Sequence, residues 1–480
     1  MSNQQGASLV EKLKGLTGNP IDIAVRTIKT NSGASIQLAF LRSLADPAPV
    51  TNFLTKVDQL NLSETSFAQA GEVFIADNDQ AQDSFIVTNL LKGAIIVYLA
   101  SRKPFAVMTD SLTKRPPTQP ETERSVRGPR DGFIENIFDN LSLLRRRLPD
   151  PSLRADEIVI GRRTKTKIAV VYLADVADPD LIMEVKSRLG KIDVDGVWEP
   201  GILEEYIKDN KLTAFPLSLI TERPDKVIGA VLEGRAAILV DYCPQVIVVP
   251  NSLNDLYRAP DDYYFDFWSG SLVRLVRLIG NILAIGLPGL YVALIGSSPQ
   301  LLPISLGLSV AGFRMGIPLP LYLEVLLAEI MIELFREAGL RLPYGTNQTL
   351  GTTIGIIVGF ALIQTGYIST PTLIIVGISA IASFTAPNFS VGLTWRITKY
   401  LLLFTSAILG FYGFILGAVF IMVHVASLTS FGAVYTIPWG PVQPSGLLDS
   451  IVRAPHWLSL NRPQVAKPTQ TTRGKKYPKE

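Results

Sequence analysis

The feature that most constrains this chain is a long apolar region in its second half, roughly Leu272 to Leu428. Of the 480 residues 48% are apolar and 18% charged, and the apolar residues are concentrated in this region. A run of about 20 apolar residues is long enough to cross a bilayer as a helix. The second half therefore predicts an α-helical polytopic membrane domain over residues 266–430.

Several stretches of this region are each long enough to cross a membrane, namely Leu272–Ile295, Gln348–Ile368, Pro371–Phe389 and Leu401–Leu428. Leu301–Arg341 either dips into the membrane or forms a hairpin of two crossings, which gives four or six spans. The tail, residues 431–480, is basic, so the positive-inside rule places it in the cytoplasm. We expect the N-terminal half there too, because residues 1–15 are polar and carry no apolar stretch typical of a secretory signal.

Inside the apolar region, the stretch Pro318–Pro343 carries four carboxylates, Glu324, Glu329, Glu333 and Glu337. At about 100° per residue, the last three share one helical face, and Glu324 lies on the opposite side. Charge at membrane depth is costly and usually faces an interior, a cavity or the headgroup layer. The stretch therefore predicts either an amphipathic helix at the membrane interface or a helix that borders a wet pathway. In the second case Glu329, Glu333 and Glu337 form a carboxylate-rich mouth, and Glu324 is a buried charge.

The stretch Gln348–Ile368 carries small and hydroxyl-bearing residues along one face. Small residues on a stripe let helices approach closely, which is one interpretation. The other is a pore lining with a hydrophobic gate that closes by dewetting. The pore and gate candidates are Thr352, Thr353, Gly355, Ile357, Val358 and Gly359. Because four to six spans are few for a channel, the pore interpretation implies a homo-oligomer.

The first half alternates β-rich runs with amphipathic helical patterns, which predicts an α/β region of two subdomains, residues 16–130 and 131–265. The predicted strands are Gly71–Ala76, Ala94–Leu99, Ile168–Leu173, Ala236–Val240 and Val246–Val249. The predicted helices are Asn136–Arg147, Pro179–Lys191 and Gly201–Lys208. A stretch rich in proline and charge, Lys114–Pro129, ends the first subdomain as a linker or exposed loop. Leu91–Leu99 and Leu232–Asp241 share a Gly-then-strand outline that is too short to establish a repeat.

Sequence motifs of enzymes are missing from the chain, which has no phosphate loop, nucleophile elbow, H-E-x-x-H run or cysteine pair. Two histidines, His424 and His456, cannot build a histidine metal cage, and we expect His424 to pack against a neighbouring helix. The net charge of +3 does not indicate a nucleic-acid partner. We therefore expect no enzyme activity, no cofactor and no metal.

Five extended motifs resemble the A subunits of GerA-type spore germinant receptors, in order and without large gaps. They are Glu121–Leu148, Ile160–Leu173, Thr221–Asp241, Pro260–Phe267 and Ile332–Pro343. The resemblance implies a multi-pass protein of the spore inner membrane with its α/β region on the core side. It implies two partners, a transporter-like B subunit and a lipoprotein C subunit, and an A subunit that assembles into a nutrient-gated cation channel.

Three other functions are compatible with the sequence. One is a non-conducting scaffold that docks the other receptor subunits through its soluble half. A second is a paralogue that works with the dipicolinic-acid release machinery. The third is a transporter with a midplane substrate site, indicated by Glu324 and the proline-broken segment before it. The sequence shows no inverted repeat in the membrane region, which disfavours the transporter.

Overall fold

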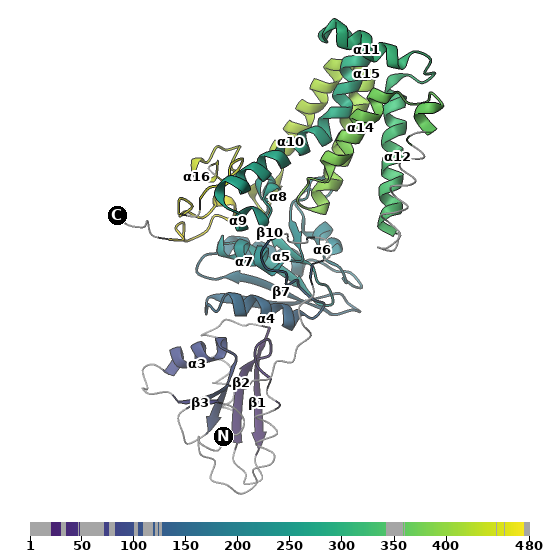
Figure 1. The fold of residues 1–480 in the computed structure, drawn as a ribbon. Helices are drawn as coiled ribbons and strands as arrows, with labels where there is room; N and C mark the ends of the chain where they lie inside the picture. Colours follow the sequence, from purple (N-terminus) through teal and green to yellow (C-terminus); the bar gives the residue numbers. More distant parts are fainter. Residues whose placement is uncertain are drawn as a thin grey trace.

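The computed structural model of the chain describes residues 21–29, 35–46, 48, 72–75, 82–99, 104–108, 119–120, 123, 127–341, 359, 361–447, 449–455 and 457–474. These residues form three parts that are stacked in space, a first sheet, a second sheet and a group of long helices (Figure 1). A C-terminal segment leaves the helices and lies beside the second sheet (Figure 1).

The first sheet has five strands in the order β1-β2-β4-β5-β3. Its elements are β1 (Ile23–Lys29), β2 (Ser35–Leu41), β3 (Glu72–Ile75), α3 (Gln82–Leu91), β4 (Ala94–Leu99) and β5 (Phe105–Met108). Side chains alternate across the interior strand β2. Ile36 and Leu38 belong to the core on one face, whereas Ala39 and Leu41 pack on the other face with α3 residues such as Leu90.

The second sheet also has five strands, in the order β6-β7-β9-β10-β8. The elements of this part are α4 (Ile137–Arg147), β6 (Leu153–Ile160), β7 (Thr166–Leu173), α5 (Pro179–Gly190), α6 (Pro200–Ile207), β8 (Leu219–Thr221), α7 (Pro224–Leu232), β9 (Ala236–Val240), β10 (Val246–Val249), α8 (Leu253–Tyr257) and α9 (Asp261–Tyr264). Three strands, β4, β9 and β10, have the bounds that their continuous apolar runs predict.

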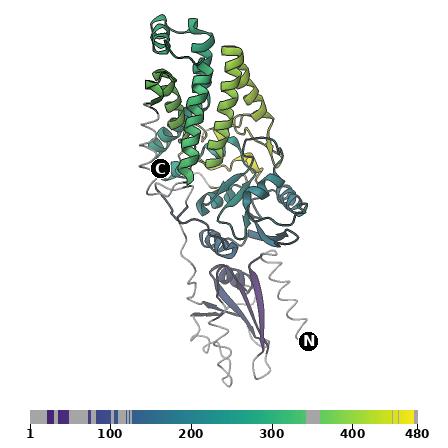
Figure 2. The same ribbon diagram turned by 90° about the vertical axis from the view of Figure 1, so that its right-hand side faces the viewer.

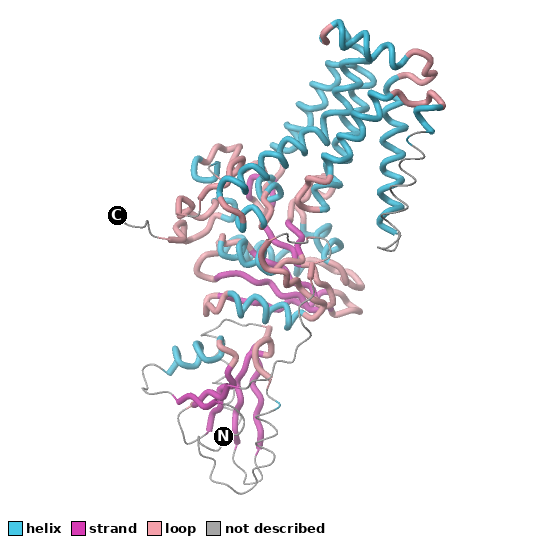
Figure 3. The backbone as a smooth tube through the Cα atoms, in the orientation of Figure 1, coloured by secondary structure: helices cyan, strands magenta, loops and turns pink. Residues whose placement is uncertain are grey.

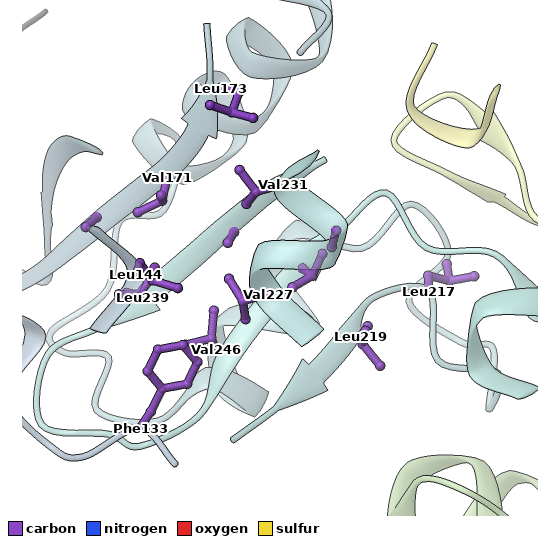
Figure 4. Packing of buried hydrophobic residues seen from close by; sticks show 14 of the residues in the cluster. Phe133, Leu144, Val171, Leu173, Leu217, Leu219, Val227, Val231, Leu239 and Val246 are labelled. Carbon is purple, nitrogen blue, oxygen red and sulfur yellow. The ribbon is translucent and has the colours of Figure 1, made fainter. Parts of the chain in front are cut away.

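Helices cover both faces of the second sheet. On one face, Leu144 of α4 and Val227 and Val231 of α7 pack against Val171 and Leu239 of the sheet (Figure 4). On the other face, the apolar sides of α5 and α6 pack against the alternate residues of the same strands. Strands β7, β9 and β10 are buried on both faces, which explains why they read as nearly continuous apolar runs.

The two sheets share one topology. In each, the strands lie in the order first, second, fourth, fifth, third, and every described neighbour pair is antiparallel. In each, a helix leads into the fourth strand through a glycine with φ +89, Gly93 or Gly234. The brief likeness of Leu91–Leu99 to Leu232–Asp241 thus marks equivalent places in two similar sheets. The mixed helix and strand content is confirmed, but antiparallel pairing excludes βαβ units in these sheets.

A buried ion pair joins the first sheet to the second part. Arg145 of α4 donates to Asp22 at 2.8 Å, and the side chains are 4% and 0% exposed. One residue earlier, the Ile21 amide donates to the Ala155 carbonyl oxygen of β6 at 2.8 Å. These contacts fix the start of β1 on the second part.

The helical part contains α10 (Phe267–Tyr291), the π-helical turn η3 (Val292–Ser297), the 3-10 turn η4 (Pro299–Leu301), α11 (Ile304–Arg314), α12 (Leu321–Arg341), α14 (Thr370–Ser383) and α15 (Phe389–Ser427). Two of its helical runs, Phe267–Ser297 and Phe389–Ser427, are long and apolar enough to cross a membrane. Helices α10, α14 and α15 run alongside one another (Figures 1 and 3). Most of the predicted span Gln348–Ile368 lies outside the described residues.

Helix α15 turns back on itself at Gly410, whose φ of 63° and ψ of −139° are not helical. The rings of Trp395 and His424 both lie near the Phe215 ring, at centroid distances of 6.2 and 5.8 Å. Twenty-nine residues of straight helix would separate Trp395 and His424 by roughly 44 Å. The prediction of one crossing over Leu401–Leu428 is therefore wrong, because the chain reverses direction within it. Only glycine adopts this backbone conformation without strain.

The C-terminal segment packs on the second part as a structured element. Its short elements are β11 (Thr429–Ser430), β12 (Ala433–Val434), α16 (Pro444–Leu447) and the 3-10 turn η5 (Gln464–Ala466). Tyr435 is fully buried and donates to the Pro216 carbonyl oxygen at 3.1 Å. Farther on, the Thr469 amide donates to the Val176 carbonyl oxygen at 2.9 Å. The basic tail predicted from sequence thus contributes to the core of the second part, which together with the first sheet forms the soluble part predicted from sequence.

Candidate functional site

The carboxylates of α12 are the candidate site, and the structure distributes them among several helices. Helix α12 runs alongside α14 (Figures 1 and 2) and also contacts η3. Its buried residues include Leu321, Val325 and Ala328, which share an apolar core with Tyr291 and Val376. This packing fits a helix within the bundle better than a helix that lies flat on a membrane surface.

Glu324 is completely buried near the start of α12. It accepts hydrogen bonds from the Ser369 amide at 2.7 Å and from the Ser369 hydroxyl at 2.5 Å. Arg314, at the end of α11, donates to its other oxygen at 3.3 Å. Glu324 is thus a buried charge that holds α11, α12 and the N-terminus of α14 together, and its two oxygens are both engaged within the chain.

Glu329 is also fully buried and forms an ion pair with Lys399 of α15, which is 2% exposed. Only one carboxylate oxygen takes part, because Oε1 of Glu329 has no hydrogen-bond partner among the described atoms. Burial of two opposite charges is tolerated when they pair directly, and it is costly for either charge alone.

Glu333 lies between two arginines. It accepts from Arg336 of its own helix at 2.9 Å and from Arg396 of α15 at 3.0 Å. Arg336 also donates to the Ser383 hydroxyl of α14 at 2.9 Å. One face of α12 therefore meets both α14 and α15 through charged groups. Glu337, one turn farther along, is exposed.

The three mouth candidates thus have different surroundings. Glu329 and Glu333 are bound to cations of α15, whereas the Glu337 side chain is exposed. Five of the pore and gate candidates, Thr352, Thr353, Gly355, Ile357 and Val358, lie outside the described residues. Gly359 is helical and half-buried, and a Cβ atom at this position would meet no other atom within 4 Å. The mouth and the gate remain predictions.

A second charged cluster, which sequence reasoning missed, joins the soluble part to α10. Arg277 makes two hydrogen bonds to Asp262, at 2.8 and 2.9 Å. Arg274 reaches Asp262 at 3.2 Å and Asp449 of the C-terminal segment at 3.0 Å. From the sequence, both arginines were interpreted only as positive charges at the cytoplasmic end of the first membrane span. The signal available was the run of aspartates and tyrosines just before α10, Asp261–Asp266.

Burial and neighbouring charge act against each other on the pKa of Asp449. Burial alone raises it, but the guanidinium groups of Arg258 and Arg274 hold the pKa below its ordinary value. Arg258 lies 3.4 Å from Asp449, and Tyr263 donates to it at 2.7 Å. Asp449 therefore stays ionised and binds the C-terminal segment to the start of α10.

His424 packs differently from the expectation. Its Nε2 lies 3.0 Å from the Thr213 hydroxyl of the soluble part, so its polar partner is not on a neighbouring helix. Within the described ranges, no three His, Cys, Asp or Glu side chains are grouped to hold a metal ion. The chemistry of α12 and of the α10 junction is therefore that of ion pairs that hold helices together.

Comparison with known proteins gives consistent similarities over most of the chain. The family model described as Bacillus/Clostridium GerA spore germination protein matches residues 11–465. Spore germination protein GerLA of Bacillus cereus is 32% identical over 97% of this chain and 96% of that protein. Spore germination protein A1 of Bacillus subtilis (strain 168) is 39% identical over 77% of each chain.

A solved structure is also similar in sequence over the first half of the chain. It is the crystal structure of the N-terminal domain of the A subunit of the Bacillus megaterium spore germinant receptor GerK3. The alignment covers 51% of this chain and 92% of that chain, at 28% sequence identity and a TM-score of 0.38.

Proposed function

This chain belongs to the GerA family of spore germination proteins, and we propose that it is the A subunit of a nutrient germinant receptor in the spore inner membrane. Family membership over nearly the whole chain is the observation that carries the proposal. The motifs Glu121–Leu148, Thr221–Asp241 and Ile332–Pro343 support the receptor role. The partners proposed from the resemblance are a transporter-like B subunit and a lipoprotein C subunit.

We propose a multi-pass topology with both ends of the helical part on one side of the membrane. The support is that Arg277, near the start of α10, donates to the Tyr257 carbonyl oxygen at 2.8 Å, and His424, near the end of α15, contacts Thr213. Two ends bound to the same soluble part require an even number of crossings. With the turn at Gly410 included, six crossings fit the helices better than four.

We further propose that several copies of the chain assemble around a cation pathway that opens when a partner subunit binds a nutrient. Within one chain, Glu329 and Glu333 are paired with cations of α15. These carboxylates are therefore not available to line an ion pathway inside a single bundle. A pathway between copies, lined by the stretch Gln348–Ile368 with Ile357 and Val358 as its gate, avoids that difficulty. Opening requires that the nutrient-bound partner contact the two states differently.

The proposed role is tested in spores of a strain in which this chain is the only A subunit. We expect deletion of its gene to abolish nutrient-triggered ion release and reintroduction of the gene to restore it. An unchanged nutrient response after deletion contradicts the receptor role. Lost assembly of the B and C subunits, with no conductance in any reconstituted form, marks the scaffold. Saturable substrate uptake marks the transporter, and a defect confined to dipicolinic-acid release marks the paralogue.

A further inference from the structure

A cavity of about 510 Å³ lies where α7, the region of α8 and α9 and the C-terminal segment meet. Its walls come mainly from residues 225–235, 255–264 and 446–473. This size is in the range of sites that hold small molecules. The cavity is formed by segments that are distant in sequence, so no local sequence motif predicts it.

The inner wall contains a buried arginine with a donor that lacks a partner. Arg235 is 2% exposed and pairs with Glu233 at 2.9 Å and Asp255 at 2.8 Å. Its Nε has no hydrogen-bond partner among the described atoms. Arg235 thus places a buried guanidinium group in the inner wall of the cavity.

Two further arginines of the C-terminal segment line the same cavity. Arg462 donates from Nε to the Leu232 carbonyl oxygen at 2.7 Å, and Arg473 from Nε to the Ser459 carbonyl oxygen at 2.7 Å. Their hydrogen-bond partners are carbonyl and hydroxyl oxygens, and neither has a carboxylate partner within the described part of the chain. No carboxylate of the described residues therefore compensates either guanidinium charge.

The acidic residues of the cavity wall are all paired with arginines. Asp225 binds Arg223 at 2.7 Å, and Asp449 binds Arg274 at 3.0 Å. Glu233 and Asp255 bind Arg235, as described above. The carboxylates thus do not neutralise Arg462 and Arg473, and the open part of the cavity carries a positive charge.

We propose that this cavity binds a small oxyanion, a molecule that carries a carboxylate or phosphate group. Arg462 and Arg473 bind it at the mouth, and the Arg235 guanidinium group lies in the inner wall. Guanidinium groups suit this ligand class because their planar N–H donors match the paired oxygens of carboxylate and phosphate. The site lies one contact from α10, because Asp449 of the cavity wall binds Arg274.

The first test is calorimetric titration of the purified full chain in detergent at low ionic strength, with inorganic phosphate and with succinate. We expect saturable binding of at least one of the two anions, which also identifies the preferred group. In the double variant Arg462→Gln/Arg473→Gln we expect affinity to fall about tenfold or more, since two charge-assisted hydrogen bonds are lost. The matched control is Arg163→Gln, because the Arg163 side chain is 84% exposed and remote from the cavity wall.

Unchanged affinity in the double variant, or no binding of either anion by the wild-type chain at millimolar concentration, overturns the proposal. A second measurement needs no substitution and covers the case of a poorly folded variant. Phenylglyoxal modification, followed by peptide mass spectrometry, reports how accessible each arginine is. We expect the binding anion to slow modification of Arg473 and to leave Arg163 unchanged. Equal rates at Arg473 with and without the anion contradict the site.

Discussion

Lys399 of α15 and Glu329 of α12 form a buried ion pair between two helices of the apolar part, with side chains 2% and 0% exposed. Seventy residues separate them in the chain. The pair explains how one of the four carboxylates of α12 is accommodated in an apolar environment. It also gives Lys399, a cation in the middle of an apolar stretch, a structural role.

Removing one member of this pair should destabilise the protein more than removing both. Each single change, Glu329→Gln or Lys399→Met, should cost roughly 3–5 kcal/mol because it leaves the other charge buried and unpaired. The double variant should be more stable than either single variant. Thermal unfolding in detergent measures this. The exposed pair Arg162 and Asp193 is the control, and Asp193→Asn should change the unfolding midpoint much less than either buried change does. If the loss of stability in the double variant equals the sum of the losses in the two single variants, the pairing is contradicted.

The turn at Gly410 should not tolerate a side chain. A Cβ atom here would lie 2.2 Å from the Ser297 hydroxyl oxygen, and φ is positive. We expect Gly410→Ala to lower the unfolding midpoint strongly, by at least the roughly 1–3 kcal/mol of one strained residue. Gly377→Ala in α14 is the matched control, because a Cβ there meets nothing within 4 Å. If Gly410→Ala is as stable as Gly377→Ala, α15 does not reverse direction at Gly410.

The mouth candidates should separate into structural and conducting residues. Glu337 is exposed, so its carboxylate can meet a passing cation, and Glu337→Gln should reduce the preference for cations over anions. Glu333 joins Arg336 and Arg396, so Glu333→Gln should lower the unfolding midpoint. Reversal potentials in a salt gradient, with unfolding curves of the same samples, measure both effects. Cation preference that is unchanged in Glu337→Gln excludes this residue from the mouth.

The soluble part should lose stability as pH rises through the raised pKa of one carboxyl group. Burial raises the pKa of Glu204, against the opposing hydrogen bond from the Ser218 hydroxyl. The folded protein therefore holds this proton more tightly than the unfolded chain does. The protonated Glu204 carboxyl group contributes fully to stability below the ordinary pKa of 4.5. This contribution is lost as the pH rises through the raised pKa of the folded protein.

In the variant Glu204→Gln, the side chain at this position is uncharged at every pH. Its unfolding midpoint should therefore exceed that of the wild type at pH 7, and the difference should shrink as pH falls toward 4.5. Unfolding curves measured between pH 4.5 and 7.5 test this. Glu205→Gln is the control, because Glu205 is an exposed neighbour on the same helix. A difference that does not change with pH contradicts the assignment to Glu204.

Sequence patterns were sufficient where burial and local chemistry agree. The run Ala236–Val240 is apolar at every position and fully buried, so its strand could be read directly. Helix α4 begins after Asn136, whose side chain caps it by accepting from the Phe138 amide at 2.9 Å. Strand β6 was missed because it lies at the edge of its sheet and carries charged residues on its exposed face.

Long-range relationships could not be read from the sequence. The apolar pattern of α15 continues unbroken through Gly410, and only tertiary packing reveals the reversal there. The partner of Lys399 depends on how α12 and α15 meet. Likewise, Arg462 and Arg473 read as part of a basic tail, and only the packing of that segment on the second part brings them to one cavity with Arg235.

The most direct measurement is ion flux through the purified chain in liposomes, after its oligomeric state has been determined. We expect a ring of defined size that conducts cations. We also expect Ile357→Ala or Val358→Ala to loosen the hydrophobic gate and cause leak without nutrient, at normal protein level. A monomer, or a ring that stays silent with its partner subunits and nutrient present, contradicts the channel and leaves the chain as a scaffold of the germination complex.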